Sequence, residues 1–240
     1  MSPIVSLALV PPLLQASTSA ASSKLGNLYD LILAGGPIMV PIALCSVVAL
    51  GYFVERLGAL AAGRLAPRSF TPALEQALAE SPAAALEFCE QQPNVALARV
   101  MSAGLRRFHE NRGEIERAVE DAGSREVATL MRRLRPLVII TAIAPLLGLL
   151  GTVTGMIKAF QVMALQKGIG KPELLAGGIS QALVTTAAGL SVAIPVQVAY
   201  YWLKSKVDRF AATTEVVFDA VVLPPLEARE AAERVKKQAA

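Results

Sequence analysis

The sequence is poor in charged residues, which make up 18% of its 240 residues, and in aromatic residues, which make up 5%. Soluble domains contain about 25% charged residues. The chain therefore has too few polar side chains to cover a globular surface of its size, and a soluble enzyme is close to excluded. The net charge of +4 does not indicate nucleic-acid binding, because the basic residues are placed by membrane topology, as shown below.

Histidine and cysteine are also scarce. His109 is the only histidine, which excludes an all-histidine metal site, and its charged surroundings predict a surface position. Cys45 lies in an apolar run and Cys89 in a distant charged segment, so neither a disulfide nor a C-x-x-C metal or redox site is expected. Nucleophile-elbow, zinc-protease and phosphate-loop motifs are absent as well. The sequence predicts no catalytic residues, no metal and no cofactor.

What the chain does have is long apolar runs, and its mean hydropathy is +0.50. Residues 31–54, 136–157 and 174–203 contain no Asp, Glu, Lys or Arg. A bilayer core about 30 Å thick requires roughly 20 apolar residues of helix, and each run is long enough. The predicted fold class is an all-α integral membrane protein with three transmembrane helices that are extended by long cytoplasmic helices.

The distribution of Lys and Arg predicts the orientation. Residues 1–36 contain one such residue and residues 55–135 contain twelve, and cytoplasmic segments carry the excess of basic residues. The N-terminus is therefore predicted to be periplasmic and the C-terminus cytoplasmic. The predicted segments are a periplasmic tail (1–30), a first span (31–54), a cytoplasmic helical segment (55–135), a second span (136–163), a short periplasmic hairpin (164–173), a third span (174–203) and a cytoplasmic C-terminal helix and tail (204–240).

Helical patterns continue beyond the second and third spans. From Glu114 the apolar spacing runs without a breaker to Pro136, which predicts one long helix entering the second span. The segment after Lys204 is predicted to continue the third span and to break at Pro224-Pro225. The N-terminal tail has a weak likeness to a signal peptide, and its cleavage stays open.

Small and hydroxyl residues form stripes on the second and third spans, as close packing of membrane helices requires. The stripes consist of Thr141, Pro145, Gly148, Thr152 and Gly155, and of Gly178, Ala182, Thr185, Gly189, Val192 and Val196. We expect Gly148, Gly155, Thr185 and Gly189 to serve helix packing. Thr152 and Thr186 are candidates for lining a polar path, and Gln181 is either an interhelical hydrogen-bond partner or part of a pore mouth.

Titratable groups for proton transfer are missing from the spans. The three charge-free runs contain no carboxylate and no histidine, although chains that move ions usually keep such residues in the membrane. If protons cross the membrane here, another subunit should supply the group that binds and releases them.

Residues 144–157 and 178–195, together with Gly35-Gly-Pro-Ile-Met-Val-Pro41 and Glu55-Arg-Leu57, resemble the motifs of the MotA/TolQ/ExbB proton channel family, in the order found in its ExbB-like members. The resemblance covers Tyr29 to about Lys206. It implies a homopentamer in the bacterial inner membrane around a dimer of a small single-span ExbD/TolR-like protein, which carries the proton-binding aspartate. A TonB-like protein would transmit the work to outer-membrane transport.

The resemblance also implies site residues. Thr152 and Thr186 fall on the pore-lining threonines of the family, and Gln181 falls on a glutamate of the third span. Gln181 is therefore expected to line the pore without carrying protons. Three alternatives stay open: a TolQ-like subunit for cell-envelope constriction, a non-conducting pentameric scaffold, and a small solute carrier, which the absence of an inverted repeat disfavours.

Overall fold

The structure is a computed structural model that describes residues 35–60, 62–165 and 172–239. The predicted periplasmic tail (1–30), the first residues of the predicted first span and most of the predicted hairpin (164–173) lie outside the described residues. In the described part of the chain, every regular element is helical. This agrees with the predicted all-α class.

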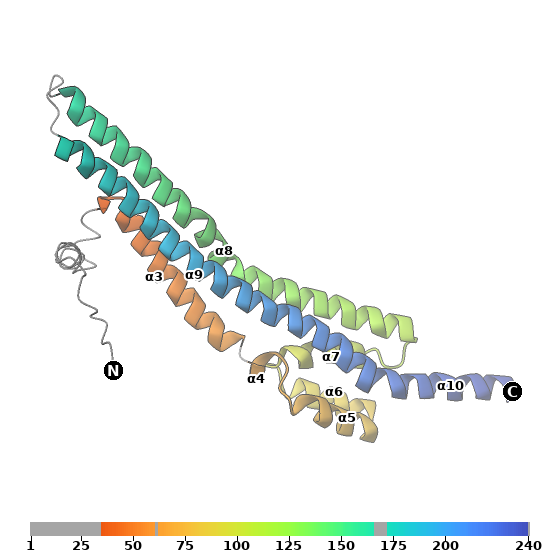
Figure 1. Ribbon diagram of the computed structural model, residues 1–240. Helices are drawn as coiled ribbons and strands as arrows, with labels where there is room; N and C mark the ends of the chain where they lie inside the picture. Colours follow the sequence, from red (N-terminus) through yellow and green to blue (C-terminus); the bar gives the residue numbers. More distant parts are fainter. Residues whose placement is uncertain (1–34, 61, 166–171, 240) are drawn as a thin grey trace, which may run out of the picture. The chain divides into compact units, whose positions relative to one another are not determined.

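Three helices are long and apolar enough to cross a membrane. Helix α3 covers Met39–Ala59, α8 covers Arg112–Leu165 and α9 covers Pro172–Val217 (Figure 1). In each candidate span, little of the most apolar 18-residue stretch is buried within the chain. The buried share is 11% in the first span, 28% in the second and 22% in the third. The remaining apolar surface requires lipid or other subunits to remove it from water.

The single helix predicted from Glu114 into the second span is confirmed, because α8 runs for 54 residues without interruption. The predicted break at Pro224-Pro225 is wrong. The π-helical turn η1 (Phe218–Val222) leads directly into α10 (Leu223–Ala239), with both prolines in the first turn of α10. The amide of Leu223 bonds the carbonyl of Phe218 in the π register. After this wider turn, Pro224 and Pro225 lie at the start of a helix, where the absence of their N–H groups costs least in hydrogen bonding.

The chain divides into two compact units. The first consists of the described residues of Met1–Val47 together with Ala142–Ala193, and the second of Val48–Thr141 together with Ile194–Ala240. In the first unit, α8 and α9 lie side by side and run in opposite directions, with the start of α3 beside α9 (Figure 1). The candidate site lies in this unit.

The second unit contains the short helices α4 (Ala62–Leu65), α5 (Phe70–Glu80), α6 (Pro82–Glu90) and α7 (Ala96–Leu105). Helix α5 packs on α6 and η1, and α6 packs on α7. Ser81 separates α5 from α6 and caps the N-terminus of α6, because its hydroxyl accepts a hydrogen bond from the amide of Ala84 at 3.0 Å. Pro82 follows in the first turn of α6, where its missing N–H group costs little. The ring of Phe70, which is buried, lies 5.4 Å from the ring of the half-buried Phe88.

Candidate functional site

Helices α8 and α9 meet through faces of small residues. On α8 the buried residues of this face are Ala144, Gly148, Gly151, Gly155 and Ala159, and on α9 they are Ala182, Thr185, Gly189 and Ala193, with Gly178 half-buried at the same spacing. Both sets repeat at spacings of four and three, which keeps them on one side of a helix. The four residues predicted to serve helix packing, Gly148, Gly155, Thr185 and Gly189, all lie in this interface.

The predicted stripes were only partly right. Thr141, Pro145 and Thr152 are half-buried at the edge of the α8 face, and Val192 and Val196 are half-buried on α9. The prediction missed four interface residues, namely Ala144, Gly151, Ala159 and Ala193. From Gly148, a step of four residues leads to Thr152 and a step of three to Gly151, and only the position of the neighbouring helix decides between them.

The backbones of α8 and α9 approach closely because the interface lacks side chains. A β-carbon at Gly189 would lie 2.6 Å from the carbonyl oxygen of Ala144, and one at Gly148 would lie 3.1 Å from the carbonyl oxygen of Thr185. A β-carbon at Gly151 would overlap the side chain of Thr185. Thr185 is fully buried and donates its hydroxyl to the carbonyl of Ala182 at 2.8 Å. Its polar atom is thus satisfied inside the interface.

Thr152 and Thr186 lie on the same side of the helix pair. Thr152 follows the interface residue Gly148 by four positions, and Thr186 follows Ala182 by four. Each threonine is therefore rotated about its helix axis by about 40° from that interface residue, in the sense in which its chain winds. Because the helices run in opposite directions, the same rotation brings both threonines to one side. Thr186 donates its hydroxyl to the carbonyl of Gly148 at 3.2 Å, and Thr152 donates to its own helix at the carbonyl of Leu149, at 2.7 Å.

Gln181 faces the other side of the pair. It precedes Thr186 by five residues, or about 140° around the helix, and its amide nitrogen donates to the carbonyl of Gly35 at 3.2 Å. The amide lies against Gly36, whose φ of 72° is favourable only for glycine. The structure therefore brings Thr152 and Thr186 to one side and places Gln181 at the start of α3.

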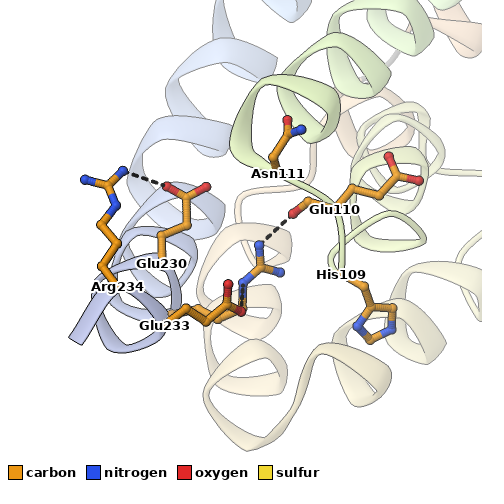
Figure 2. Close-up of a pocket in the computed structure, with 7 residues that line it drawn as sticks. His109, Glu110, Asn111, Glu230, Glu233 and Arg234 are labelled. Atoms are coloured by element: carbon orange, nitrogen blue, oxygen red, sulfur yellow. Dashed lines mark hydrogen bonds and ion pairs between the residues drawn. The ribbon is translucent and has the colours of Figure 1, made fainter. Parts of the chain in front are cut away.

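A second polar cluster lies in the other unit, where α10 meets the segment before α8. Figure 2 shows Glu230 and Glu233 of α10 on one side, with Glu110 and Asn111 on the other. Arg229 donates to the backbone carbonyl of Glu110 and lies 3.6 Å from a carboxylate oxygen of Glu233.

Further contacts of this cluster are structural. The guanidinium of Arg229 stacks on Phe108 at 5.4 Å, and Arg112 pairs with Glu227 at 2.7 Å. His109 is exposed, as predicted, and is one of the residues that line a cavity beside this cluster. A hydrogen bond with Glu114 raises the pKa of the Glu110 carboxyl, with burial as a second cause. Most charges of the cluster pair with one another, and these contacts hold α10 against the segment before α8.

The described residues also include two cysteines. Burial raises the pKa of the Cys89 thiol to about 12, and the neighbouring Glu90 carboxylate adds to this, so the thiol is protonated and inert near neutral pH. Both Cys45 and Cys89 are free thiols. Among the described residues, no cluster of His, Cys, Asp and Glu is arranged to hold a metal ion.

Comparison with known proteins places this geometry in context. The profile of the MotA/TolQ/ExbB proton channel family matches residues 92–216. A protein named as biopolymer transport protein ExbB-like 1, from Synechocystis sp., is 35% identical over 198 residues, which cover 78% of this chain and 76% of the relative. Biopolymer transport protein exbB1 of Vibrio cholerae is 43% identical over 90 residues, covering 38% of this chain and 40% of the relative. The Tol-Pal system protein TolQ of Haemophilus influenzae is 37% identical over 92 residues, covering 38% and 40%.

Proposed function

Because the chain belongs to the MotA/TolQ/ExbB proton channel family, we propose that it is an ExbB-type subunit of an inner-membrane motor driven by the proton motive force. The motor would energise transport through TonB-dependent receptors of the outer membrane. Three apolar helices and the family membership make the chain a multi-pass membrane protein. The assembly of the subunits, the orientation of the chain and the position of the pore are proposed in addition.

In the proposed assembly, five copies of this chain surround a dimer of a small single-span ExbD/TolR-like protein. The N-terminus lies in the periplasm, residues 55–135 and 204–240 lie in the cytoplasm, and the spans are residues 31–54, 136–163 and 174–203. The excess of Lys and Arg in residues 55–135 supports this orientation. The largely unburied apolar surface of the three helices supports an assembly in which neighbouring subunits and lipid cover it.

The observation that carries the proposal is the position of Thr152 and Thr186 on one side of the α8–α9 pair, away from the start of α3. In a ring of subunits, this side would face the central pore and α3 would face outward. The charge-free runs contain no carboxylate or histidine. The hydroxyls can line a path, but they do not titrate near neutral pH and so cannot carry a proton. Because the spans offer no other titratable group, the membrane aspartate of the partner would carry it.

The mechanism follows from the cost of a charge in the membrane. Protonation of the partner's aspartate from the periplasmic side neutralises it and lowers the cost of moving it past apolar pore walls. The hydroxyls of Thr152 and Thr186 would solvate the carboxyl at the positions where it stops. Each proton supplies about 2.3 kcal/mol per 100 mV of membrane potential, so several protons would drive one step of the partner.

Gln181 has a different part in this arrangement. Its side chain is committed to the carbonyl of Gly35 within the same chain. In the proposed ring it would fix the start of α3 against α9, on the side of the helix pair that faces away from the pore, without taking up protons. A carboxylate is not needed for this role, which is consistent with an amide at this position.

The test replaces each hydroxyl by a methyl group of nearly the same size. Thr152→Val and Thr186→Val should abolish energy-dependent uptake through a TonB-dependent receptor while the complex still assembles. Thr154→Val is the matched control, because Thr154 also bonds its own helix, to the carbonyl of Leu150 at 3.0 Å, and points about 160° away from Thr152. Wild-type uptake in both Thr152→Val and Thr186→Val would contradict the pore assignment.

A TolQ-type role is the second candidate, and the match to TolQ of Haemophilus influenzae favours it. Deletion of the gene separates the two roles. An ExbB-type role predicts loss of uptake through TonB-dependent receptors with an intact envelope. A TolQ-type role predicts chained cells and detergent sensitivity with normal uptake.

A further inference from the structure

A cavity of about 510 Å³ lies between α8 and α9 within the second unit. It falls within the size range of small-molecule sites, which is about 300–1,000 Å³. Its polar lining comes from two guanidinium groups and a phenol. The lining residues are Arg132, Arg135 and Tyr200, with the apolar residues Ala128, Met131, Val138 and Ile139.

The charge of this cavity is of one sign. No carboxylate lines it, and within the described part of the chain neither Arg132 nor Arg135 forms an ion pair. The arginines of the cluster at α10 differ in this respect, because they pair with glutamates. Two guanidinium groups beside one cavity form a site for an anion with several oxygen atoms, such as a phosphate group.

The cavity lies where the apolar part of α8 begins. Arg132 and Arg135 precede the charge-free run of residues 136–157, and Tyr200 lies near the end of the run of residues 174–203. Tyrosine at such a position is typical of a membrane–water interface. Val138 and Ile139, which line the apolar end of the cavity, are 40% and 54% exposed. Along α8, the two arginines lie in the middle of the lining, between Ala128 and Met131 on one side and Val138 and Ile139 at the apolar end that continues into the span.

We propose that this cavity binds an anionic phospholipid of the inner leaflet. Arg132 and Arg135 hold the phosphate, the Tyr200 hydroxyl contacts the headgroup, and an acyl chain lies against Val138 and Ile139. A soluble phosphate or nucleotide would leave this apolar end exposed, whereas a phospholipid covers it. Basic pockets between membrane helices on the cytoplasmic side are suited to such headgroups. The inference rests on the proposed orientation, which places residues 55–135 in the cytoplasm, but not on the proposed pore, so failure of the Thr152 and Thr186 tests would leave it unaffected.

The test counts the phospholipids that co-purify with the full-length oligomer after mild extraction, by mass spectrometry. The double variant Arg132→Gln/Arg135→Gln should retain at least about tenfold less anionic phospholipid than wild type, because two charge-assisted contacts are lost. Arg133→Gln is the matched control, since Arg133 lies in the same turn but does not line the cavity. It should retain the wild-type amount.

A second measurement uses only the wild-type protein, in case the double variant fails to assemble. The oligomer is stripped of lipid and offered vesicles of phosphatidylglycerol or of phosphatidylethanolamine, with inorganic phosphate as a soluble competitor. We expect selective recovery of phosphatidylglycerol that phosphate does not displace. Equal recovery of both lipids, displacement by phosphate, or equal loss in Arg133→Gln and the double variant would overturn the proposal.

Discussion

The close approach of α8 and α9 makes Gly189→Ala the sharpest test of the packing. The added β-carbon would lie 2.6 Å from the carbonyl oxygen of Ala144 and 3.1 Å from the Cα of Gly148. Both are backbone atoms, which cannot rotate away as a side chain could. An ordinary contact of about 3.4 Å requires the helices to move apart by about 0.8 Å at this point.

The cost of this movement can be worked out from its parts. Overpacking of this kind costs about 1–3 kcal/mol. The bond from Thr186 to the carbonyl of Gly148, already 3.2 Å long, would be stretched beyond hydrogen-bonding distance, at a cost of about 0.6 kcal/mol in a membrane bundle. Alanine gains about 1 kcal/mol of helix propensity over glycine. Gly189→Ala should therefore destabilise the protein by about 0.6–2.6 kcal/mol.

Gly177→Ala is the control on the same helix. A β-carbon at Gly177 meets no atom within 4 Å, so this variant should gain up to about 1 kcal/mol from helix propensity alone. Thermal unfolding of the purified oligomer in detergent, followed by circular dichroism, should show a lower Tm for Gly189→Ala and an unchanged or higher Tm for Gly177→Ala. Equal Tm values for the two variants would show that α8 and α9 do not pack as described.

Two further predictions concern the second unit. In a Cys45→Ala background, Cys89 should resist iodoacetamide at pH 8 and react only on unfolding, because burial raises its pKa to about 12; rapid alkylation of the folded protein would contradict this. The raised pKa also means that the contribution of this thiol to stability is constant below pH 9 and decreases above it. Arg229→Ala should make α10 much more sensitive to limited proteolysis than Arg112→Ala does, because Arg229 covers Phe108 whereas the Arg112–Glu227 pair is exposed. Equal sensitivity of the two variants would show that the ion pairs alone hold α10.

Much of the fold could be predicted because it depends on local pattern. The charge-free runs identify the apolar helices, and the unbroken apolar spacing from Glu114 predicts α8. The continuation past Pro224 and Pro225 could not be predicted in this way. A π-helical turn before the prolines absorbs their missing N–H groups, and no residue pattern in this segment signals such a turn.

The site was predicted in part, for a similar reason. Residue type indicated that Gly148 and Gly189 would serve close packing, since only small residues allow it. The inclusion of Gly151 depends on the position of Thr185 on the other helix. The partner of Gln181 is the carbonyl of Gly35, 146 residues away in the sequence. A backbone acceptor at that distance leaves no signal in the sequence, so the sequence alone leaves both interpretations of Gln181 open.

The proposed motor can be tested by counting its subunits. Native mass spectrometry of the complex, extracted gently from its own membrane, should show five copies of this chain with two copies of a small single-span protein. The sequence of that protein should contain an aspartate within its membrane span. A stable homo-oligomer without such a partner would contradict the motor and leave a membrane scaffold, in which Thr152 and Thr186 have no carboxyl group to solvate.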